Sequence, residues 1–157
     1  MKTLSVFASL LLLPALALAD SRLDSTIETL RELERGQRGC RVLHASWTEE
    51  DGFGGSLAVA IHEGKVTVSE SRIGLPDLER TGSVDQATCQ KLARLALEGE
   101  LWKLSKKQDR NPLAPALRMG VTNGSAFKAR ISLDQAPKAM LALRETMKQL
   151  AGDIAKK

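Results

Sequence analysis

The scarcest reactive side chains in this 157-residue chain are two cysteines, Cys40 and Cys89, and two histidines, His44 and His62. A Ser–His–Asp triad is recognised by its geometry, so sequence order alone does not exclude one that uses either histidine. The chain has no nucleophile-elbow motif, however, and the histidines lack the accompanying ligand spacing of zinc sites. It also has no phosphate-cradling loop or dinucleotide fingerprint. We therefore expect a protein that is not an enzyme, with no catalytic residue, no metal and no cofactor.

The two cysteines are the residues best suited to a covalent cross-link. No C-x-x-C motif is present, which argues against a redox site. In an oxidising compartment we expect a Cys40–Cys89 disulfide; two buried free thiols are the alternative. Closing a loop of about 50 residues would stabilise the fold by at most about 4 kcal/mol on the chain-entropy estimate.

The first 19 residues have the features of a secretory signal peptide. Lys2 precedes an apolar run from Leu10 to Leu18, and Ala17-Leu18-Ala19 is a small-x-small cleavage site. A membrane-spanning helix needs about 20 apolar residues, more than this run supplies. We expect cleavage after Ala19 and a periplasmic or secreted product without a transmembrane segment.

The remaining 20–157 region has the size of one domain, with a helix and connection over 20–39 and the core over 40–157. Its net charge is 22 − 19 = +3 once Lys2 is removed, which gives no argument for a nucleic-acid partner.

Three helices are indicated by capping residues and apolar periodicity. Ser25 with Glu28, and Ser83 with Gln86, have the capping-box spacing. These two helices are expected to end near Gly36 and at Gly99. For the last helix we expect Asp134 as the cap and Pro137 in the first turn. The predicted apolar faces comprise Ile27, Leu30 and Leu33; Cys89, Leu92, Ala93 and Ala96; and Met140, Leu143, Met147, Leu150 and Ile154.

Alternating apolar residues predict strands over 41–48, 56–62, 65–70, 116–122 and 125–133, and a short strand over 78–81 is a further option. Glu63-Gly64 and Asn123-Gly124 are hairpin turns. We expect residues 103–115 to form a polar loop, and Trp47 and Trp102 to lie in the core. The fold class is therefore α+β: a single domain with an antiparallel sheet of about five strands, including two hairpins, packed by two or three helices.

The connection between the first two strands is the most interesting polar segment. An aromatic residue among glycines, after three acidic residues, can anchor a partner protein. Phe53 folded back onto the core, and acidic side chains that are only solvated, are the alternative interpretations. The candidate partner-binding residues are Glu49, Glu50, Asp51, Gly52, Phe53, Gly54 and Gly55.

Basic residues in the loop after the middle helix and on the last two strands are candidates for one positive surface. Ordinary solubilising charge is the alternative. The candidates are Lys103, Lys106, Lys107, Arg110, Arg118, Lys128 and Arg130.

The order of a hairpin, a helix ending in Leu101-Trp102, a second hairpin and a last helix resembles emfourin-type inhibitors of thermolysin-like metallopeptidases. The segment from Gly52 to Gly55 is similar to the glycine–aromatic–glycine turn of that family, and the likeness spans about Arg41 to Ala151. The resemblance implies peptidase inhibition through this turn. We expect a non-catalytic protein that binds another protein in the envelope or outside the cell, and the alternative is a module that binds anionic polymer or lipid through its basic face.

Overall fold

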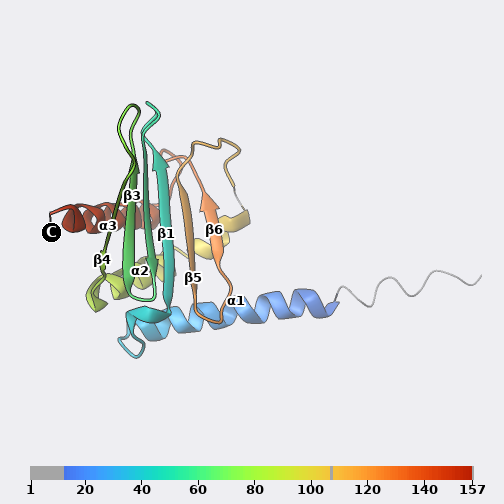
Figure 1. Ribbon diagram of the computed structural model, residues 1–157. Helices are drawn as coiled ribbons and strands as arrows, with labels where there is room; N and C mark the ends of the chain where they lie inside the picture. Colours follow the sequence, from blue (N-terminus) through green and yellow to red (C-terminus); the bar gives the residue numbers. More distant parts are fainter. Residues whose placement is uncertain (1–12, 107, 157) are drawn as a thin grey trace, which may run out of the picture.

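Six strands form one antiparallel sheet in the computed structural model, which describes residues 13–106 and 108–156. The spatial order is β4-β3-β2-β1-β5-β6, so the first strand lies inside the sheet and joins the two predicted hairpins (Figure 1). The strands are β1 (Leu43–Glu50), β2 (Ser56–His62), β3 (Lys65–Ser71), β4 (Leu78–Ser83), β5 (Ala116–Val121) and β6 (Phe127–Arg130). The sheet exceeds the predicted five strands because Leu78–Ser83 pairs along β3 from Glu70 to Lys65.

The two faces of the sheet have different environments because side chains alternate along each strand. One face carries Trp47, Val59 and Leu117, which are buried against the helices. The other face of the sheet is open and points toward the viewer in Figure 1. Both predicted hairpin turns are present, and Glu63, Gly64 and Asn123 have the positive φ angles that such turns require.

Three helices, α1 (Leu13–Glu34), α2 (Gln86–Glu98) and α3 (Lys138–Ala155), complete a single α+β domain. Figure 1 shows α2 and α3 behind the sheet and α1 across its lower end. Their predicted apolar faces supply much of the core, although Ile27 and Leu150 are only half-buried. The predicted polar loop over 103–115 instead begins within a 3₁₀ helix, η2 (Leu101–Lys106).

The helices begin at residues other than those that the sequence predicts. Helix α2 is capped by Asp85, whose carboxylate accepts a hydrogen bond from the Thr88 N–H at 2.6 Å. Ser83 is not available as the cap because it ends β4, paired with Lys65. Ser25 lies within α1, which starts upstream, and Pro137 rather than Asp134 is the N-cap of α3. The ends at Gly36 and Gly99 are confirmed.

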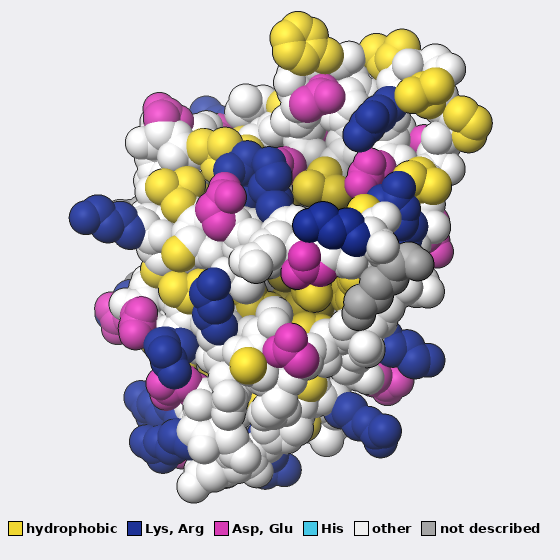
Figure 2. Space-filling view, turned by 90° about the vertical axis from the view of Figure 1, so that its left-hand side faces the viewer, with side chains coloured by type: hydrophobic (Ala, Val, Ile, Leu, Met, Phe, Trp, Pro, Cys, Tyr) yellow, Lys and Arg dark blue, Asp and Glu magenta, His cyan; other side chains and the backbone are white. Residues whose placement is uncertain are grey.

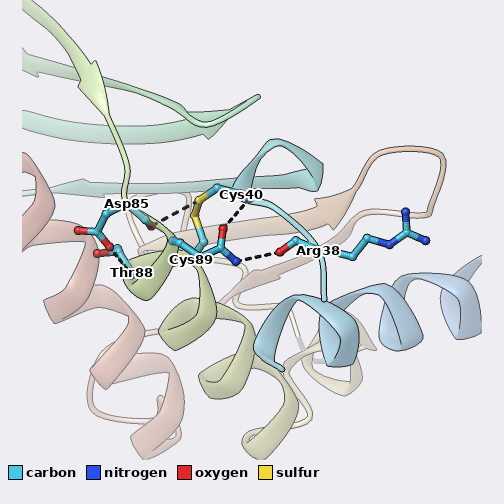
Figure 3. Close-up of a disulfide and its surroundings, with 6 residues drawn as sticks. Arg38, Cys40, Asp85, Thr88 and Cys89 are labelled. Carbon is cyan, nitrogen blue, oxygen red and sulfur yellow. Dashed lines mark hydrogen bonds between the residues drawn. A yellow bond between two sulfur atoms is a disulfide. The ribbon is translucent and has the colours of Figure 1, made fainter. Parts of the chain in front are cut away.

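The Cys40–Cys89 disulfide joins the start of the sheet to α2, as predicted (Figure 3). The Cα atoms of the two residues are 5.7 Å apart. Gln86 holds the same junction, because its side-chain carbonyl accepts from the Cys40 N–H at 3.0 Å and its amide donates to the Arg38 carbonyl at 2.8 Å. The covalent bond and the hydrogen bonds therefore anchor one end of the molecule.

Residues 1–12 of the predicted signal peptide lie outside the described residues, and residues 13–19 form the first part of α1. Within the described part of the chain, no helix is both long and apolar enough to cross a membrane.

Candidate functional site

Two hairpin ends lie side by side at the end of the sheet opposite α1 (Figure 1). They expose four large apolar side chains, which we call the apolar tip: Phe53, Ile73, Leu75 and Leu78. Phe53 is 87% exposed and Ile73 is 77% exposed. Figure 2 shows hydrophobic side chains gathered at this end of the molecule. Phe53 therefore does not fold back onto the core, and it stands beside apolar residues from a second loop.

The turn that carries Phe53 is held by the carboxylate of Asp51. One carboxylate oxygen accepts from the backbone N–H of Phe53 at 2.8 Å and from that of Gly55 at 2.9 Å. These two N–H groups hold the pKa of Asp51 below its usual range. The backbone N–H of Asp51 in turn donates to the Gly55 carbonyl at 3.0 Å. The side chain of Phe53 is thus presented on a turn that is ordered before any partner binds.

The glycines of this turn have separate physical reasons to be glycine. Gly52 and Gly54 have φ angles of +77° and +85°, which disfavour other residues. A Cβ atom on Gly54 would also lie 2.5 Å from a side-chain carbon of Ile73. A Cβ atom on Gly55 would clash with the Asp51 carboxylate. The glycines therefore allow the carboxylate and the neighbouring loop to approach the backbone closely.

Exposed acidic side chains border the apolar tip. Glu50, Asp77 and Glu79 are exposed, and none of them forms an ion pair with another of the described residues. The nearby cations Arg72 and Arg80 are partly neutralised by Glu70, at 3.4 and 3.7 Å. The tip therefore combines an apolar centre with a mainly acidic border.

Glu49 lies apart from the other residues of the predicted turn because its side chain is directed to the helix-covered face. Its carboxylate accepts from Arg144 Nε at 2.6 Å and Nη2 at 3.1 Å, and from Trp47 Nε1 at 3.0 Å. Lys148 Nζ is 3.1 Å away. Burial alone would raise the pKa of Glu49, but these donors outweigh it and lower the pKa. Glu49 thus connects β1 to α3.

The two histidines lie on the open face of the sheet, because they alternate with the buried residues Ala45 and Ile61. Their ring centroids are 4.5 Å apart. His44 Nε2 is 2.9 Å from Thr122 Oγ1. No group of three or more metal-ligating side chains occurs in the part of the chain that the structure describes.

The predicted basic residues are divided between several environments. Arg118 and Lys128 are opposite each other on β5 and β6, whereas Arg130 donates a hydrogen bond to the Pro112 carbonyl. Lys103 lies on η2 and pairs with Glu100 at 2.7 Å. The remaining candidates are Lys106 and Arg110, which are exposed, and Lys107, which lies outside the described residues.

Sequence reasoning missed Ile73, Leu75 and Leu78 as site residues because their segment contains Gly74 and Pro76, which are typical of loops. Apolar residues that recur within such a loop, without a regular strand or helix pattern, were the available signal. Proximity to Phe53 depends on the pairing of β2 with β3, which only the fold shows.

No model of a protein family matches this chain, and a search of curated proteins finds no significant match.

Proposed function

We propose that this is an exported, non-catalytic protein that binds another protein through the apolar tip. The observation that carries the proposal is the 87% exposure of Phe53 on a turn fixed by Asp51. Leaving a phenylalanine in water forgoes the burial of about 150–250 Å² of mostly apolar surface. A partner that encloses the ring recovers that stabilisation, and a turn that is already ordered reduces the entropy lost on binding.

The chemistry of the tip also defines the partner surface that we expect. Phe53 and Ile73 require an apolar pocket, because their side chains form the most exposed part of the tip. The acidic border favours lysine or arginine around that pocket, since complementary charge increases the rate and specificity of association. The resemblance of the Gly52–Gly55 turn to emfourin-type inhibitors makes a thermolysin-like metallopeptidase the first partner to test.

The test compares wild-type protein with Phe53→Ala and with Leu133→Ala, which truncates an exposed side chain on the connection between β6 and α3. Each protein is used as bait in envelope and culture-supernatant extracts at low and high salt, and each is assayed for inhibition of a thermolysin-like metallopeptidase. We expect Phe53→Ala to weaken binding of a specific partner by about 30-fold or more, as for an anchor residue. Its free energy of unfolding should change by less than about 0.5 kcal/mol.

A partner that Leu133→Ala retains at high salt and Phe53→Ala loses supports the proposal. Equal retention by all three proteins excludes the tip as the contact. Inhibition of the peptidase that requires Phe53 would identify the partner class, whereas a different partner with the same dependence would support protein binding without peptidase inhibition.

A further inference from the structure

A second surface lies on the open face of the sheet, at the end opposite the apolar tip. There a depression of about 440 Å³ is lined by residues of β1, β2, β5 and the turn after β5. Its volume is within the range of small-molecule sites. It is hollow because the outward side chains between its walls are short: Ser46, Ala60 and Gly120. Gly120 has no room for a larger residue, since a Cβ atom there would lie 2.9 Å from the Cα atom of Ala126.

Two imidazole rings line this depression and face each other across β1 and β2. His44 and His62 continue the register in which Ala45 pairs with Ile61, which brings their ring centroids to 4.5 Å. Thr122 fixes one ring through its hydroxyl, 2.9 Å from His44 Nε2. An imidazole can donate a hydrogen bond from one nitrogen when neutral and from both when protonated. The pair therefore provides hydrogen-bond donors at the edge of an empty space.

Cations lie to either side of these rings. Arg118 lines the depression and is opposite Ser46 on one side and Lys128 on the other. Lys65 is opposite His62 in the β2–β3 register. None of these three cations forms an ion pair within residues 13–106 and 108–156.

Two further charged groups lie at the turn between β2 and β3. Arg41 approaches this turn, with its Cγ 3.7 Å from the position of a Cβ atom on Gly64. The nearby carboxylate is that of Glu63, which acts electrostatically on His44. Among the described groups named around the two histidines, the cations outnumber this carboxylate, so these surroundings carry net positive charge.

We propose that this depression binds the phosphate or carboxylate group of a small anionic ligand, with Arg118 as the principal charge and the two histidines as hydrogen-bond donors. A guanidinium presents parallel N–H groups that match the oxygen spacing of both kinds of anion. The short side chains between Arg118 and the histidines leave room for the rest of the ligand. The site is separate from the apolar tip. It involves fewer residues than a general basic face, because Lys103, Lys106 and Arg110 do not line it.

Protonation of His44 should be coupled to occupation of this site. Partial burial, the adjacent His62 ring and Arg118 lower the pKa of His44, although Glu63 acts in the opposite direction. An anion between these groups offsets the repulsion between cations and favours the imidazolium form. Binding must therefore favour proton uptake by His44, and affinity must increase as the pH falls through the pKa of His44 in the bound state.

Nuclear magnetic resonance tests this proposal directly, because the chain contains only two histidines and single His→Gln variants assign their signals. Sodium sulfate is the probe, since its charge stays constant between pH 5.5 and 7.5, and sodium chloride at equal ionic strength is the reference. We expect saturable shifts of both histidine signals and at least threefold tighter binding at pH 5.5 than at pH 7.5. Arg118→Gln should weaken binding about tenfold, whereas Arg110→Gln, with the same change of net charge, should leave it unchanged.

The same variants distinguish a soluble ligand from an anionic group carried by a lipid. Saturable binding of inorganic phosphate without flotation on phosphatidylglycerol vesicles supports the site with a soluble ligand. Flotation that Arg118→Gln abolishes and Arg110→Gln retains supports the site with a lipid headgroup. Linear shifts, or equal effects of the two arginine variants, overturn the proposal. A response of both histidines to zinc ions but not to sulfate also overturns it in favour of a metal site.

Discussion

The ion pair between Glu49 and Arg144 gives the sharpest test of how β1 and α3 are held together. The Glu49 and Arg144 side chains are only 13% and 20% exposed, so solvent screens this pair less than a surface ion pair. Two guanidinium nitrogens reach the carboxylate, at 2.6 and 3.1 Å, and the Trp47 indole donates at 3.0 Å. Glu49→Gln keeps the shape of the side chain and removes its charge. It also directs an amide N–H group toward Arg144, Lys148 and Trp47, which can only donate hydrogen bonds. Hydrogen bonds to charged groups contribute about 1.5–3 kcal/mol, so we expect the free energy of unfolding at pH 7 to fall by about 2–3 kcal/mol.

The pH dependence separates loss of charge from loss of packing. The donors around Glu49 lower its pKa in the folded state, relative to an ordinary value of about 4.3 in the unfolded chain. Its contribution is therefore complete above the unfolded pKa and is lost as the pH falls through the folded pKa. The difference between wild type and Glu49→Gln should be large at pH 7 and should shrink below about pH 4.

Urea unfolding at pH 7 and again below about pH 4, followed by tryptophan fluorescence, measures this difference. Glu145→Gln is the matched control, because Glu145 also pairs with Arg144 at 2.7 Å but its side chain is 67% exposed. We expect this control to lose less than about 0.5 kcal/mol. A pH-independent loss for Glu49→Gln, or an equal loss for Glu145→Gln, would refute the reasoning.

Three further predictions concern the disulfide, the tip and the first helix. The double variant Cys40→Ser/Cys89→Ser should lose up to about 4 kcal/mol in urea unfolding, and a loss below about 1 kcal/mol would contradict the loop-closure argument. Gly54→Ala should lower the thermal midpoint more than Gly52→Ala, because both positions have positive φ but only the former meets a side chain of the neighbouring loop; equal effects would show that this contact does not matter. Thr26→Val should cost about 1–2 kcal/mol in chemical unfolding, since the buried hydroxyl lies 2.9 Å from a carbonyl of the β5–β6 turn; an unchanged midpoint would assign that carbonyl another partner.

The sequence by itself determined the features that depend on neighbouring residues. Glu63-Gly64 and Asn123-Gly124 indicate hairpins because their residues tolerate positive φ, and period-2 alternation predicts which strand residues are buried. The Cys40–Cys89 pairing was also predictable, since only two cysteines are present. The turn from Asp51 to Gly55 could be singled out because its pattern of glycines around one aromatic residue is unusual for a short connection.

Tertiary structure decided which distant residues share a surface. Ile73 joins Phe53 only because β2 and β3 place their connecting loops at the same end of the sheet. His44 and His62 face each other through strand register, and Arg118 is brought beside them by the pairing of β5 with β1. Local sequence cannot specify these contacts, because they depend on the order and register of strands that are distant along the chain.

Tertiary contacts also gave some residues structural roles that differ from those their local sequence predicts. Ser83 has the spacing of a helix cap, but its backbone is paired in β4 and Asp85 takes that role. Glu49 resembles a solvated acidic residue next to Glu50, yet alternation directs it toward Arg144 on α3. In both cases a long-range contact satisfies a polar group more completely than the local arrangement would, because the fold supplies partners that neighbouring residues cannot.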